Sequence, residues 1–99
     1  MLIRIVKLGF KPEHINTFTA NFHKNKQAIR NFEGCEFLEL YQDNQNKHVF
    51  FTYSYWRSAQ HLEHYRQSDL FQQIWAATKP LFNMKPEAWS VNKLETVSV

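Results

Sequence analysis

The sequence predicts an α+β fold of ferredoxin type, in which helices cover one face of a four-stranded antiparallel sheet. Two observations predict it. Strand-like and helix-like segments alternate along the 99 residues in the order β-α-β-β-α-β. The length suits one domain, and no linker, repeat or low-complexity stretch divides the chain. We therefore expect a single domain over residues 1–99.

The first two elements are a strand and a helix. Residues 2–10 (LIRIVKLGF) are rich in β-branched and apolar residues, which predicts a strand with both faces in need of cover. Pro12 and Glu13 suit the first turn of a helix, and Gly34 suits its end. Between them, the apolar residues that follow helical spacing are Ile15, Phe18, Phe22, Ile29 and Phe32.

The remaining elements complete the pattern. Residues 35–42 and 48–56 predict a hairpin around an Asn- and Asp-rich turn at 43–47. Ser58 suits the N-cap of a second helix, and Ser68 suits the N-cap of its continuation. The sequence KPLF at 79–82 ends that helix, and a closing strand is predicted over residues 88–97.

The alternation of side chains along the third strand predicts two different sheet faces. The face away from the helices would show a set of bulky apolar side chains: Ile3, Ile5, Phe51, Tyr53 and Tyr55. An exposed apolar patch of that size usually marks an interface. We therefore expect a homodimer that pairs through Phe51, Tyr53 and Tyr55.

The face toward the helices predicts a binding site. Thr52, Ser54 and Trp56 point the same way, and the two small residues leave volume under large rings. Apolar cavities with a few polar groups are typical of small-molecule sites, and aromatic walls suit a flat aromatic ligand. The candidate substrate-binding residues are Ser54 and a set of aromatic side chains: Phe18, Phe22, Phe71, Trp75 and Trp89.

Composition excludes several classes of protein. A content of 16% aromatic residues with a net charge of +3 argues against disorder. No apolar run is long enough to span a membrane. Arg4 and Lys7 interrupt the apolar run at the beginning of the sequence, so we expect a cytoplasmic protein without a signal peptide. The single cysteine, Cys35, cannot form an internal disulfide. His61 and His64 share a helix face but are too few for a zinc site, so no metal is expected.

Several segments together resemble the antibiotic biosynthesis monooxygenase domain family of the dimeric α+β barrel superfamily. They are FFTYSYW-x-S at 50–58, LE-x-YR-x-S-x-LF at 62–71, KPLF at 79–82 and KP-x-AW at 85–89. The resemblance implies a dimeric barrel, and a monooxygenase that oxidises an aromatic or quinol-type substrate without a cofactor. Such chemistry needs a base, an orienting donor and a dry cavity. The candidate catalytic residues are Trp56, Thr52 and His48.

Other interpretations stay open. The chain has Trp75 where related haem-degrading enzymes have a histidine, and Thr52 where some polyketide monooxygenases have an asparagine. These departures favour a non-catalytic small-molecule-binding or stress-associated dimer as the alternative. A second interpretation is that Trp56 and Trp75 are ordinary core residues and that His48 is a solvated residue of the hairpin.

Nucleic-acid binding is the weakest alternative. RNA-recognition motifs share the element order and carry aromatic residues on the third strand. This chain lacks the glycines of that signature, and its first strand is aliphatic. We expect no nucleic-acid partner.

Overall fold

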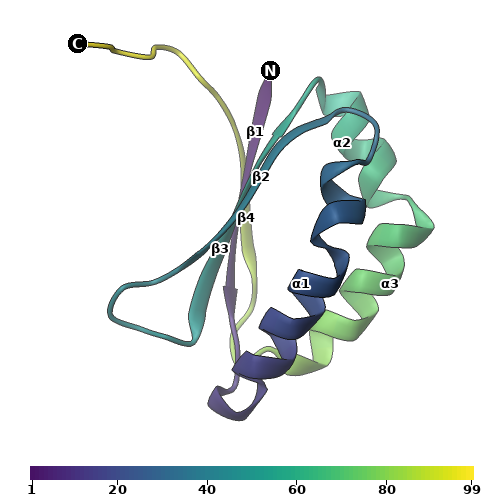
Figure 1. The fold of residues 1–99 in the computed structure, drawn as a ribbon, viewed down its shortest axis with the longest axis vertical. Coiled ribbons are helices and arrows are strands. Elements are labelled where there is room, and N and C mark those ends of the chain that lie inside the picture. The colour runs from purple at the N-terminus through teal and green to yellow at the C-terminus, as the bar shows by residue number, and fades with distance from the viewer.

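A four-stranded antiparallel sheet carries helices on one of its faces in the computed structural model, which describes residues 1–99 (Figure 1). The strands are β1 (Leu2–Gly9), β2 (Cys35–Gln42), β3 (Val49–Trp56) and β4 (Glu87–Asn92). Their order across the sheet is β2-β3-β1-β4, and every pair is antiparallel. The predicted fold class and element order are confirmed.

Three α-helices form the second layer. A single 3₁₀ turn (Pro12–His14) leads into α1 (Ile15–Arg30), and α2 (Ala59–Arg66) is followed by α3 (Asp69–Thr78) and a 3₁₀ turn (Lys79–Leu81). Both predicted serine caps are confirmed. The Ser58 hydroxyl accepts a hydrogen bond from the His61 amide (3.2 Å), and the Ser68 hydroxyl accepts one from the Phe71 amide (3.1 Å).

Gly34 is the one residue with a positive φ, at 90°. Only glycine adopts this left-handed backbone without strain. A Cβ atom at this position would also collide with the side chain of His61 on α2. Gly34 therefore turns the chain out of α1 and lets α2 pack closely over the start of β2.

Two predicted boundaries are wrong. Helix α1 ends at Arg30 and not at the glycine, because a turn separates the two. The closing strand ends at Asn92, where residue 97 was predicted. Its only neighbour is β1, whose first residue, Leu2, pairs with Asn92. Later residues therefore have no strand to pair with, and residues 93–99 form no regular structure.

The core between sheet and helices consists of two buried clusters. The first cluster gathers residues from β1, β3, α1 and the turn after α3: Leu8, Phe10, Phe18, Phe50 and Leu81. The second cluster gathers residues from α1, α2 and the start and end of the hairpin: Ile29, Cys35, Trp56, Leu62 and Tyr65. Phe10 and Trp56 are the most deeply buried large side chains, one in each cluster.

No helix covers the opposite face of the sheet (Figure 1). We call it the outer face. The register aligns Ile3 with Tyr55 and Ile5 with Tyr53, so the side chains predicted to share this face do share it. Phe37 of β2 stacks on Tyr55 with ring centroids 4.6 Å apart. The outer face is therefore largely aromatic. None of the helices is both long and apolar enough to cross a membrane.

Candidate functional site: a cavity between the sheet and the helices

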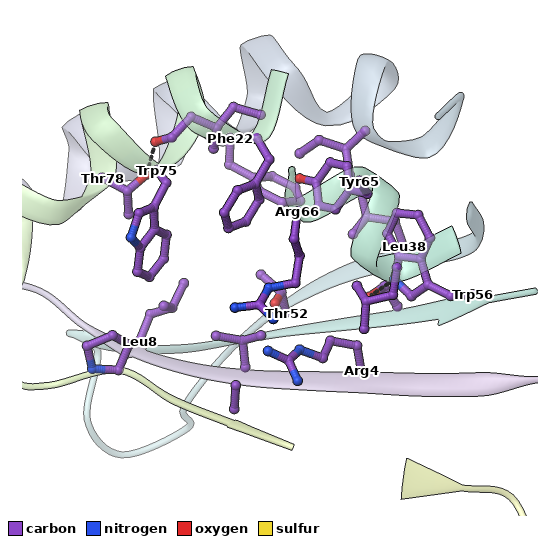
Figure 2. A pocket seen from close by; sticks show the side chains of 18 of the residues that line it. Arg4, Leu8, Phe22, Leu38, Thr52, Trp56, Tyr65, Arg66, Trp75 and Thr78 are labelled. Atoms are coloured by element: carbon purple, nitrogen blue, oxygen red, sulfur yellow. Dashed lines mark hydrogen bonds between the residues drawn. The ribbon is translucent and has the colours of Figure 1, made fainter. Parts of the chain in front are cut away.

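A cavity of about 270 Å³ lies between the sheet and the helix layer (Figure 2). Its walls include members of both core clusters, such as Leu8 and Phe18 from the first cluster and Trp56 and Tyr65 from the second. Helix α3 packs mainly on α1 and α2, while α1 packs on β2. The cavity therefore occupies the space where the two clusters do not meet.

Small side chains in the middle of β3 form the floor of the cavity. Thr52 and Ser54 point toward the helices, and they pair in the sheet with Val6 and Arg4 of β1. Ala88 of β4 adds a third small side chain to the lining. Because strand side chains alternate, this row of small residues lies directly beneath the helices and leaves space there.

Aromatic side chains from α1, α2 and α3 form the roof. Phe22 of α1 and Trp75 of α3 point down toward the sheet (Figure 2). Phe71 stacks on Trp75 with ring centroids 5.9 Å apart and planes 12° apart. The structure thus brings together five of the predicted substrate-binding residues around one cavity: Phe18, Phe22, Ser54, Phe71 and Trp75.

Trp56 lines one end of the cavity as part of the second cluster. It is only 1% exposed and stacks on Tyr65 with ring centroids 4.9 Å apart. Its Nε1–H donates a hydrogen bond to the Ser54 hydroxyl (3.0 Å). The indole N–H already has a partner, so Trp56 supplies a wall, while the Ser54 proton stays available to a ligand.

Two predicted site residues lie outside the cavity. Trp89 pairs with Ile5, which places it on the outer face, where it is 45% exposed. The prediction that Trp89 roofs the site is therefore wrong. His48 belongs to the turn before β3. Phe50, which lies between His48 and Thr52 in the sequence, is buried in the first cluster. His48 does not line the cavity, so it is not placed to act as a base there.

Two arginines that the sequence analysis missed line the cavity. Arg4 of β1 lies along the floor, and Arg66 reaches down from α2 toward Thr52 (Figure 2). Arg4 Nη1 donates a hydrogen bond to the Ser90 hydroxyl (3.0 Å). Burial lowers the pKa of Arg4, and the positive charge of Arg66 lowers it further. The position of Arg4 could have been predicted, because strand residues two apart point to the same face and Arg4 alternates with the inward-facing Val6 and Leu8.

The cavity offers little general-base chemistry. Besides the two arginines, its ionisable lining residues are Tyr65 and Glu87. Burial raises the pKa of Tyr65, so its phenol stays protonated. The Glu87 carboxylate instead lies 4.0 Å from the ammonium group of Lys7. The dominant charge in the cavity is therefore the positive charge of the two guanidinium groups.

Comparison with known proteins points to one family. The sequence profile described as "Antibiotic biosynthesis monooxygenase" matches residues 1–77. No curated protein sequence matches the chain.

Solved structures share the fold at low sequence identity. The crystal structure of an antibiotic biosynthesis monooxygenase is 16% identical with a TM-score of 0.89, over 96% of this chain and 100% of that one. A conserved protein from Methanosarcina mazei Go1 is 23% identical with a TM-score of 0.87, over 94% and 93% of the two chains. A Mycobacterium tuberculosis protein is 18% identical with a TM-score of 0.88, over 98% of each chain.

Proposed function

Because the chain belongs to the antibiotic biosynthesis monooxygenase family, we propose that it is a cofactor-independent monooxygenase that oxidises a small aromatic, quinol-type substrate in the cavity between sheet and helices. The cavity is the observation that carries the proposal. Its volume of about 270 Å³ lies just below the roughly 300–1,000 Å³ of typical ligand sites. The substrate is therefore a compact molecule with one or two fused rings.

The lining residues have distinct roles in this proposal. The rings of Phe22 and Trp75 pack on the substrate and exclude water. The substrate binds as its phenolate or enolate, and the guanidinium groups of Arg4 and Arg66 stabilise that anion. Thr52 donates a hydrogen bond that orients the substrate. No protein base is needed, because the two positive charges lower the pKa of the bound hydroxyl group.

The bound anion then supplies the electrons for the reaction with O₂. It passes electrons to O₂, one oxygen atom forms a bond to a ring carbon, and the other oxygen atom leaves as water. The C–H bond at that ring carbon breaks, and the substrate supplies the two electrons that complete the water. One proton of the water comes from that C–H bond, and the other is taken up from solvent in place of the proton that the substrate released on binding as an anion. The protein contributes position, charge and a dry cavity.

Oxygen consumption tests this proposal directly. With a panel of one- and two-ring quinols and naphthols, an oxygen electrode is expected to record uptake that persists in the presence of EDTA and without added flavin. Thr52→Val, which keeps the shape of the side chain and removes its hydroxyl, is expected to lower kcat about tenfold, the usual effect of one lost hydrogen bond. Absence of uptake across the panel, with ligand binding intact, would favour a non-catalytic binding protein instead.

We also propose that the outer face pairs with the outer face of a second copy of the chain. The aromatic outer face supports this proposal. It includes Phe51, Tyr53 and Tyr55, and no helix covers it (Figure 1). Apolar faces of this kind are typical of self-complementary interfaces between identical subunits. Pairing there would extend the core of a small chain across two subunits.

Light scattering tests the dimer. We expect a mass of twice the 11.9 kDa of the chain at micromolar concentration. Tyr53→Asp puts a charge in the middle of the face and is expected to yield the monomer mass, because a buried unpaired carboxylate is strongly unfavourable. Gln73→Glu, an exposed site on α3, is the control and should leave the mass unchanged. A monomeric mass for the unaltered protein would contradict the proposal.

A further inference from the structure

The two arginines in the cavity have few negative partners. The only side-chain hydrogen bond of Arg4 goes to a neutral group, the Ser90 hydroxyl. Arg66 has one acidic neighbour, Glu63, on its own helix and at 3.6 Å. Both of these side chains are about half exposed, so the ion pair between them is weak. One carboxylate therefore faces two guanidinium groups.

The two guanidinium groups also act on each other. Burial lowers the pKa of Arg4, and Arg66 lies near enough for its positive charge to lower that pKa further. Burial and like-charge repulsion both destabilise a cation. Arginine does not lose its proton in proteins, so deprotonation does not relieve this free-energy cost. A bound anion between the two groups would relieve it.

We propose that the cavity binds an aromatic carboxylate, with the carboxylate between Arg4 and Arg66 and the ring under Phe22 and Trp75. Figure 2 shows the arrangement: both guanidinium groups lie near Thr52, and the aromatic roof lies above and to one side of them. This inference rests on the proposed function only in taking the cavity as the ligand site, and not on any reaction with O₂.

The chemistry of the lining favours a carboxylate on a flat ring. A guanidinium group presents parallel N–H donors that match the two oxygens of a planar carboxylate. The hydroxyl groups of Thr52 and Ser54 lie on the floor beside Arg4 and can donate further hydrogen bonds. The rest of the lining is mostly hydrophobic, so it suits an apolar body with a single anionic end.

Binding of 2-naphthoate and of its neutral isostere 2-naphthamide tests the inference. Both are titrated by calorimetry into the unaltered protein. We expect naphthoate to bind at least roughly tenfold more tightly than naphthamide, as charge-assisted hydrogen bonds require. The preference should fall as NaCl rises, because the charged groups are partly exposed.

Three arginine variants locate the effect. Arg4→Gln and Arg66→Gln are each expected to weaken naphthoate binding roughly tenfold and to leave naphthamide binding unchanged. Arg57→Gln is the matched control, since Arg57 is exposed outside the cavity and pairs with Glu36 at 2.9 Å. It should alter neither affinity. If Arg4→Gln does not fold, the exposed Arg66→Gln and the salt dependence decide the question.

Three results would overturn the inference: equal affinity for acid and amide, arginine variants that weaken both ligands equally, or no binding of either ligand. The test is separate from that of the proposed function. Failure of O₂ uptake with retained preference for naphthoate would reject the oxygenase and keep the carboxylate site. Uptake with a neutral quinol and no preference for naphthoate would do the reverse.

Discussion

Trp56→Ala is expected to lower the free energy of unfolding by about 3–5 kcal/mol, the usual cost of removing a large buried aromatic side chain. Trp56 is only 1% exposed, stacks on Tyr65 and donates its N–H to Ser54. The change would leave a large void and an unsatisfied hydroxyl group in the second core cluster. Because small domains are stable by about 5–15 kcal/mol, much of the total stability would be lost. Urea denaturation followed by circular dichroism measures the effect.

Trp56→Phe is the control for this prediction. It keeps an aromatic ring against Tyr65 but removes the N–H that Ser54 accepts. We expect a loss of about 1–3 kcal/mol, the penalty of an unsatisfied buried polar group, and a protein that still folds. A loss below about 1 kcal/mol for the alanine variant would show that Trp56 is not the buried wall described above.

Thr52→Phe is expected to weaken binding of an aromatic ligand at least about 100-fold, because the new ring would occupy the middle of the cavity. Thr52 points into that space from the floor (Figure 2). Adding atoms to a packed core costs about 1–3 kcal/mol, but here they enter a cavity of about 270 Å³, so the free energy of unfolding should change little. Titration with 2-naphthoate and a thermal melt measure the two effects.

Thr52→Val is the matched control for the filled cavity. It keeps the volume of the side chain, so the naphthoate affinity should stay within about tenfold of the unaltered protein, the effect of one lost hydrogen bond. Unchanged binding in the phenylalanine variant would mean that the ligand does not occupy this cavity.

The elements of the fold could be predicted because their signals are local. Alternation placed Thr52 and Tyr53 on opposite faces of β3, and helical spacing turned Phe22 and Trp75 inward, as the structure confirms. Ser58 and Ser68 cap their helices because a serine hydroxyl satisfies a free amide wherever a helix begins. Each of these features depends on neighbours a few residues away.

The errors in β4 and in the cavity have a common cause in long-range contacts. Trp89 was assigned to the cavity, but its face depends on the register between β4 and β1, which come from opposite ends of the chain. A shift of one residue would turn the side chain to the other face. The length of β4 has the same origin, since the strand ends where β1 offers no further partner. Arg4 and Arg66 were missed because they come from distant segments, β1 and α2, and line one cavity only in the folded chain.

The sequence by itself therefore determined the order of the elements and the inward-facing side of β1, β3 and the helices, because those properties follow from local periodicity. Only the tertiary structure decided that the inward-facing side chains leave a cavity between the two core clusters. That outcome depends on how far α3 stands from the sheet, which is set by its packing on α1 and α2. The same packing placed two arginine side chains from distant segments in one apolar space.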